Sequence, residues 1–150
     1  MRISLAGLRF DGVRIESWSD ALLRVVAEID VRVADLIIYR EVEFRVVEFA
    51  YQLHRWLICE LDGGADFEYR SMESDDNPLI WIRQIDSVWR WGSRFGQGDV
   101  SVSIEDVRVA AGRFITDLDD RARRQFDLKL LAVLLDATGA SGNSPSGELP

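Results

Sequence analysis

The sequence has little of what builds disulfides, zinc sites or membrane spans. It holds one cysteine and one histidine in 150 residues, so it can form no disulfide within the chain. Nor can it supply the Cys/His ligand set of a structural zinc site. No stretch approaches the roughly 18 apolar residues of a transmembrane helix, and the N-terminus lacks the apolar run of a signal peptide. We therefore expect a cytoplasmic protein.

Motifs for catalysis are also missing. Gly92 and the Gly96-Gln97-Gly98 stretch do not form a phosphate-binding loop and are better explained by a turn between a strand and a helix. His54 and Cys59 lie on one predicted helix at a spacing that puts them on different faces, so they form no nucleophilic pair. We expect a protein that is not an enzyme and that uses no cofactor or metal.

Positive charge is scarce. The chain has 18 Lys and Arg against 26 Asp and Glu, a net charge of −8. Nucleic-acid binding depends on clustered Lys and Arg that contact phosphates. The densest basic group, Arg121–Arg124, directly follows Asp117, Asp119 and Asp120, which is typical of a solvated helix surface with internal ion pairs. We expect no nucleic-acid partner and no membrane partner.

Alternation of apolar and polar residues predicts the strands. Residues 2–17 alternate loosely around Asp11-Gly12, which favours a hairpin. From Leu23 to Val33 every odd position is apolar, which predicts a strand with one solvated face. Ala34-Asp35 links this strand to a neighbour that should pair with it antiparallel. The remaining expected strands are 36–44, 66–71, 79–84 and 88–95.

Apolar residues at three- and four-residue spacing predict a helix over 45–61 that ends at Gly63-Gly64. Ser103–Asp106 resembles a capping box and should begin a second helix, and a further helical segment is expected at about 120–137. Residues 138–150 are rich in Gly, Ser, Asn and Pro and should form a disordered tail. Residues 1–137 are then one α+β domain, in which an antiparallel sheet of about five to seven strands is covered by two or three helices.

The most informative segment is acidic and runs from Asp66 to Pro78. It places carboxylates between two predicted strands, and tryptophans follow on the next strands. Acids at a sheet end beside aromatic rings suit the binding of a basic protein surface, and Trp is common in binding hot spots. The candidate partner-binding residues are Glu68, Glu73, Asp75, Asp76, Trp81, Trp89 and Trp91.

Other interpretations of these residues stay open. The acids are compatible with a solvated loop, or with a Ca²⁺ or Mg²⁺ site, although the glycine of a calcium-binding loop is missing. The tryptophans are compatible with a core face or a cross-strand aromatic pair.

Phe67–Ser74, Pro78–Arg83 and Trp89–Ser93 resemble segments of small bacterial single-domain proteins, some of which resemble the immunity proteins of toxin–immunity pairs. The likeness covers about residues 20–118. It implies an acidic binder that occupies the active cleft of a basic toxin enzyme, where opposite charge speeds association. A non-enzymatic, acidic protein-binding module of this kind is the first functional hypothesis. The second is a structural or self-associating domain with an aromatic homodimer interface. The third is a small enzyme or ligand-binding domain with acids at its site.

Overall fold

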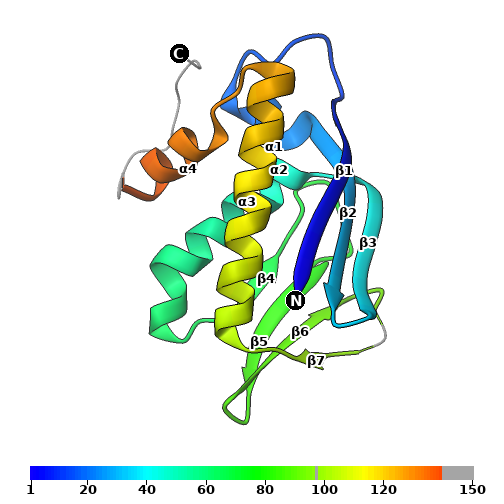
Figure 1. The fold of residues 1–150 in the computed structure, drawn as a ribbon, viewed down its shortest axis with the longest axis vertical. Coiled ribbons are helices and arrows are strands. Elements are labelled where there is room, and N and C mark those ends of the chain that lie inside the picture. Colours follow the sequence, from blue (N-terminus) through cyan, green and yellow to red (C-terminus); the bar gives the residue numbers. More distant parts are fainter. Residues whose placement is uncertain (97, 140–150) are drawn as a thin grey trace.

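The computed structural model describes residues 1–96 and 98–139. Strands and helices alternate irregularly along this part of the chain (Figure 1). In order they are β1 (Arg2–Phe10), α1 (Trp18–Arg24), β2 (Val25–Val33), β3 (Leu36–Phe44), α2 (Val46–Arg55), β4 (Phe67–Tyr69), β5 (Ile80–Ile85), β6 (Val88–Ser93), β7 (Val100–Ser101), α3 (Ile104–Phe126) and α4 (Leu130–Gly139).

The described strands form two antiparallel sheets, one in the order β1-β2-β3 and one in the order β4-β5-β6-β7. The α+β class and the antiparallel pairing are thus confirmed, whereas the expectation of one continuous sheet is wrong. Where the second sheet approaches β3, the hydrogen bond comes from a side chain and not from a neighbouring strand. The Ser93 hydroxyl, at the end of β6, donates a hydrogen bond to the backbone carbonyl of Ile38.

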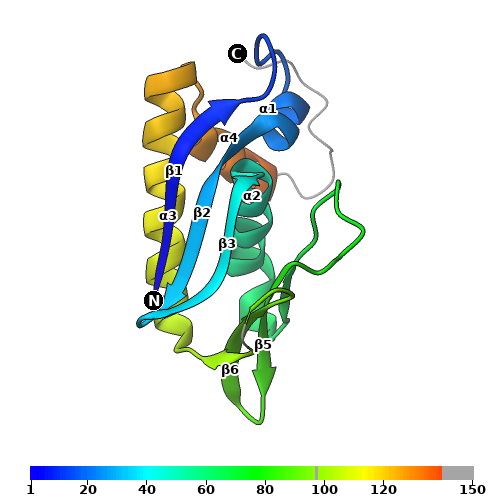
Figure 2. The same ribbon diagram turned by 90° about the vertical axis from the view of Figure 1, so that its right-hand side faces the viewer.

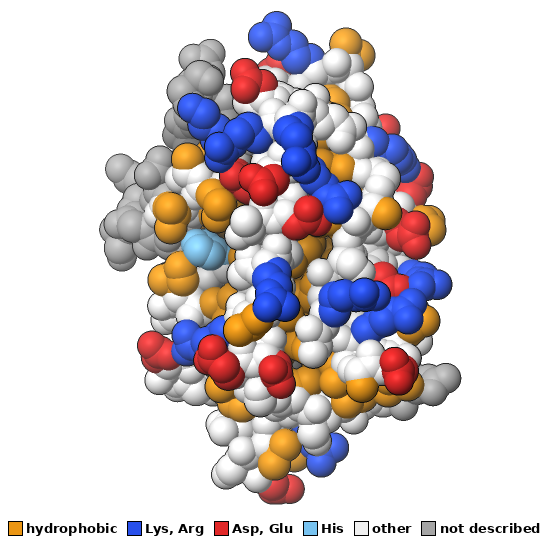
Figure 3. All heavy atoms as spheres, viewed as in Figure 1, with side chains coloured by type: hydrophobic (Ala, Val, Ile, Leu, Met, Phe, Trp, Pro, Cys, Tyr) orange, Lys and Arg blue, Asp and Glu red, His pale blue; other side chains and the backbone are white. Residues whose placement is uncertain are grey.

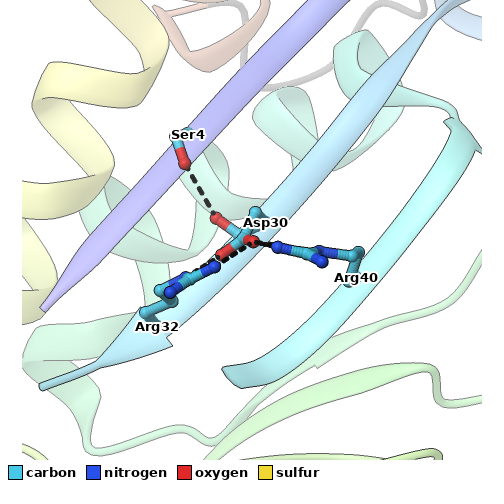
Figure 4. A network of polar contacts seen from close by, with 4 residues as sticks. All are labelled: Ser4, Asp30, Arg32 and Arg40. Atoms are coloured by element: carbon cyan, nitrogen blue, oxygen red, sulfur yellow. Dashed lines mark hydrogen bonds and ion pairs between the residues drawn. The ribbon is translucent and has the colours of Figure 1, made fainter. Parts of the chain in front are cut away.

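The three-stranded sheet has one buried face and one solvated face. Helices α2 and α3 lie behind it in Figure 2, and Ile29 and Val31 of β2 are wholly buried on that side. On the opposite face, Asp30 accepts hydrogen bonds from Arg32 of its own strand and Arg40 of β3, and Ser4 of β1 donates to the Asp30 carbonyl (Figure 4). The predicted alternation is therefore confirmed from Ala27 to Arg32, whereas Val26, which the pattern placed on the solvated face, is buried.

The expectation of a hairpin within residues 2–17 is wrong. Residues 2–10 are a single strand, and Asp11 donates its amide to the Arg24 carbonyl instead of turning the chain back on itself. Residues 18–24 are a helix because Ser17 and Asp20 form a capping box, in which the Ser17 hydroxyl accepts from the Asp20 amide and Asp20 accepts from the Ser17 amide. Leu23 and Arg24 thus belong to α1 and not to the following strand.

The predicted helix over 45–61 is present but changes its winding. After α2 the chain forms a π-helical turn, Trp56–Glu60, and a 3₁₀ turn, Leu61–Gly63. Gly64 then takes a left-handed conformation with φ of 77°, as the glycine pair predicts.

The C-terminal helices differ from expectation in where they break. Ser103 caps α3 as predicted, with its hydroxyl 3.0 Å from the Asp106 amide. The helix continues past residue 120 and ends where Asp127 adopts a left-handed φ of 54°. Helix α4 extends to Gly139, and most of the predicted tail, residues 140–150, lies outside the described residues.

Aromatic side chains join the two sheets into one core. The ring of Phe49, on α2, has its centroid 5.3 Å from that of Phe44 on β3 and 5.2 Å from that of Tyr69 on β4. Trp56 extends the contact to the second sheet, with its ring 5.4 Å from that of Phe67. Helix α2 is therefore the common packing surface of both sheets.

Candidate functional site

Two polar side chains of α2 fix the start of the acidic β4–β5 loop. Gln52 exchanges two hydrogen bonds with the backbone of Arg70, as a neighbouring strand would. One turn earlier, the buried carboxylate of Glu48 accepts from the Tyr69 hydroxyl at 3.1 Å and from the Met72 amide at 3.1 Å. Burial, reinforced by the negative charge of Glu48, raises the pKa of Tyr69. The loop is thus attached to the core through the Glu48 carboxylate. Burying such a group is costly unless it is hydrogen-bonded, and Tyr69 and Met72 supply these bonds.

The far end of the loop is closed by Asn77. Its side-chain oxygen accepts from the Ser71 amide at 2.9 Å, and its nitrogen donates to the carbonyls of Ser71 and Ser74. The following Asn77–Pro78 peptide bond is cis. Both ends of the segment from Ser71 to Asn77 are therefore held in place, and its carboxylates project from a defined backbone.

A cleft of about 770 Å³ separates this loop from β3. One wall is the strand itself, from Tyr39 to Phe44, and the other is the loop with Leu79 and Phe95. Its volume is within the roughly 300–1,000 Å³ of ordinary ligand clefts, but its lining is mostly polar. Six acidic residues line it, against three arginines: Asp11, Glu41, Glu43, Glu73, Asp75 and Asp76, against Arg9, Arg40 and Arg45.

Ion pairs neutralise part of this acidic lining. Glu43 pairs with Arg9, Glu73 with Arg45, and Asp76 with Arg94 at 2.9 Å. Asp75 is exposed, and in the described part of the chain no cation lies within ion-pair distance of it. Glu41 accepts from the hydroxyl of Tyr39, whose pKa is raised by burial and by that carboxylate. The cleft therefore keeps an excess of negative charge.

The structure separates the seven predicted partner-binding residues into three places. Glu73, Asp75 and Asp76 lie together on the cleft wall. Glu68 and Trp81 pair across β4 and β5 on the outer face of the four-stranded sheet. There Arg70 and Arg83 hold the pKa of Glu68 below its ordinary value, although its partial burial acts in the opposite direction.

Trp89 and Trp91, on β6, occupy the third place, and the three tryptophans differ in accessibility. Trp91 is wholly buried, so it belongs to the core and is not available to a partner. Trp89 is partly buried, with its ring 6.0 Å from that of Trp56. Trp81 lies over Gly92 and donates to Asp99 at 3.0 Å, with the Arg83 guanidinium 5.0 Å from its ring centroid. A Cβ added at Gly92 would come within 2.1 Å of the Asp99 carboxylate and 2.4 Å of the indole nitrogen, so a larger residue would displace this hydrogen-bonded pair.

Sequence reasoning missed the residues that position the loop. Glu48 and Gln52 are one helical turn apart and continue a polar side of the helix with Arg45 and Arg55, so nothing in the sequence distinguished them from solvated residues. Phe95, 68% exposed at the cleft, was also missed. It is the last residue of the predicted strand 88–95, and the alternation of that strand does not show that its ring is exposed.

The helix-surface interpretation of Arg121–Arg124 is supported by two ion pairs. Arg121 pairs with Asp117 at 3.0 Å, and Arg123 pairs with Asp119 at 2.8 Å. Figure 3 shows acidic and basic side chains interspersed over the face that α3 and β1 form. Such mixing produces no continuous basic patch on that face.

His54 and Cys59 have different environments. The Nε2 of His54 is buried and has no hydrogen-bond partner in the described part of the chain, whereas Cys59 is exposed. Burial lowers the pKa of His54. Among residues 1–96 and 98–139, no group of three His, Cys, Asp or Glu side chains is arranged to hold a metal ion. No helix within these ranges is long and apolar enough to cross a membrane.

These features define a small α+β protein with an acidic cleft between two antiparallel sheets. The chain belongs to the DUF7878 family, a domain of unknown function, whose model matches residues 8–124. The match includes every residue that lines the cleft. No curated protein and no solved structure matches the chain.

Proposed function

We propose that this protein is a non-enzymatic binding module whose acidic cleft binds a basic protein, in the manner of an immunity protein that neutralises a basic toxin enzyme. The observation that carries the proposal is the fixed position of the acidic loop. Glu48 and Gln52 hold its beginning, and Asn77 holds its end. A loop ordered before binding loses less conformational entropy when a partner docks.

The charge of the cleft supports a basic partner. Carboxylates on opposing walls raise the negative potential between them, which attracts a positively charged surface and speeds the encounter. The net charge of −8 adds a long-range attraction of the same sign. A toxin that binds nucleic acid would present such a positive surface, because its substrate is an anion.

The test begins by purifying the partner with the protein from its native host and identifying it by mass spectrometry. Surface plasmon resonance then compares the wild type with a variant that carries Glu73→Gln, Asp75→Asn and Asp76→Asn. A matched control carries Glu105→Gln, Asp117→Asn and Asp120→Asn on α3, which changes the net charge equally.

We expect the cleft variant, and not the control, to associate more slowly at low salt. The difference should shrink as ionic strength rises, because the Debye length falls from about 10 Å at 0.1 M to about 3 Å at 1 M. An acidic partner, or equal association rates for both variants, would refute the proposal.

Self-association remains a second candidate, and one observation favours it. Trp81 is only partly buried on the outer face of the four-stranded sheet. Sedimentation velocity of the wild type and of Trp81→Ala distinguishes the two functions. A dimer that persists at high salt and is lost on Trp81→Ala would favour the aromatic homodimer.

A further inference from the structure

Strand β3 has a free edge along the acidic cleft. Within residues 1–96 and 98–139 it is the last strand of its sheet, and its one strand partner is β2. In an antiparallel pair, every second residue turns its N–H and C=O away from the partner strand. Figure 2 shows β3 as the strand of its sheet that lies nearest the β4–β5 loop. The outward backbone groups of β3 therefore face the cleft that its side chains line.

This edge is closed at one end and open along the rest. At the closed end, the Ile38 carbonyl accepts from Ser93, and the turn at Gly96 lies against the same carbonyl. From Tyr39 to Glu43, no other described element forms a hydrogen bond with the backbone of β3. The register with β2 is regular from Tyr39 to Glu41 and shifts between Glu41 and Phe44, where two residues of β3 lie opposite one of β2. Three residues of extended chain span roughly 10 Å, which is enough for a short strand to pair.

The side chains around the open edge select a chemical class of ligand. Glu41 and Glu43 belong to the edge itself, and Asp75 faces the cleft from the loop. A strand added here would project alternate side chains to each side, so that Lys or Arg at every second position could meet these carboxylates. The exposed ring of Phe95 offers a further contact to such cations.

We propose that β3 captures an extended basic segment of the partner as an additional strand, with main-chain hydrogen bonds along the regular part of its edge, residues 39–41. This inference rests on the proposed function and specifies how the cleft would recognise its partner. Main-chain pairing would supply affinity, and the carboxylates would supply the preference for alternating basic residues.

The probe is a synthetic octapeptide of alternating Lys and Val with blocked ends, added to the ¹⁵N-labelled full-length protein. Its matched control is the same peptide with the Val nitrogens methylated, which keeps the charge but removes alternate main-chain donors. In a second control the backbone nitrogens of the Lys residues are methylated instead. Both controls are needed because either the Val or the Lys main-chain groups can face β3. Amide chemical shifts and hydrogen exchange report where the peptide binds.

We expect saturable shifts and slower exchange at amides of residues 39–41 with the unmodified peptide, and loss of both with one methylated control. Asp75→Lys should weaken binding by about two- to fivefold at low salt, the effect of one rim charge pair. Asp120→Lys on α3 should leave it unchanged.

Two results would overturn strand addition. If all three peptides bind equally and shift only the loop amides, the acidic cleft binds basic chains without pairing to β3, and the proposed function survives. If no peptide binds, strand capture is rejected, while the function is still judged separately by the native partner and its salt dependence.

Discussion

At the scale of single residues, Glu48 connects the core to the acidic loop. It is 3% exposed and accepts from Tyr69 and Met72. We expect Glu48→Ala to lower the free energy of unfolding by about 1–3 kcal/mol, since it leaves buried donors without an acceptor. Glu48→Gln keeps an acceptor oxygen and should cost less. Urea denaturation measures both, and an alanine variant as stable as the wild type would show that the loop is held by other contacts.

His54 makes stability depend on pH in a defined direction. Because burial lowers its pKa, the unfolded chain takes up the proton at a higher pH than the folded chain does. This residue should therefore reduce stability as pH falls below its ordinary pKa of about 6.5. We expect His54→Gln to remain folded and functional and to lose less stability than the wild type between pH 7 and pH 5. Identical losses measured by urea denaturation would contradict the assignment.

At the scale of elements, two substitutions in β2 test whether its residues alternate between the core face and the solvated face. Ile29 is wholly buried, so Ile29→Asp should unfold the domain by burying a charge. Asp30→Ser removes the contacts to Arg32 and Arg40 and should cost about 1 kcal/mol, at the upper end for surface ion pairs. Circular dichroism during thermal melting compares the two variants, and similar behaviour would contradict the register.

Asp30 also has its own pH range. Hydrogen bonds from Arg32 and then Arg40, together with their charges, lower its pKa to about 2. The folded chain binds this proton less readily than the unfolded chain does. The stabilising contribution is therefore complete above about pH 4 and is lost as pH falls through about 2. The stability difference between wild type and Asp30→Asn should shrink over that range in denaturation experiments.

Whether a segment is a strand or a helix was predictable where its pattern of apolar residues extends over many positions. The alternation through Ile29 and the capping serine at 103 both correspond to observed structure. Short elements were not predictable: α1 is seven residues long, and its odd-position apolar residues continue the pattern of the following strand. The capping box at Ser17 was the signal that separates the two, and it was overlooked.

At the scale of the whole molecule, α2 packs against both sheets, so we expect them to unfold as one unit. Phe49 is wholly buried between β3, β4 and α3. We expect Phe49→Ala to cost about 3–5 kcal/mol. Backbone circular dichroism and tryptophan fluorescence, to which the second sheet contributes three rings, should report the same transition. Two separate transitions would show that the sheets unfold independently.

The division into two sheets and the cleft between them could not be predicted from the sequence. Periodicity shows which residues face a core, but strand order depends on contacts far apart in the chain, such as that of Ser93 with Ile38. The acidic loop was identified from its composition. Its wall partners Glu41 and Glu43 were not, because they precede it by about thirty residues and meet it only through the fold.

The free edge of β3 has a consequence for the purified protein on its own. An unpaired strand can also join the same strand of another molecule, which is a common route to aggregation. If two copies met in this way, the carboxylates of Glu41 and Glu43 would be brought close to those of the other copy, and like charges would oppose the contact. The same side chains therefore protect solubility while the cleft is empty. Replacing both with Gln should remove this repulsion and increase association between molecules.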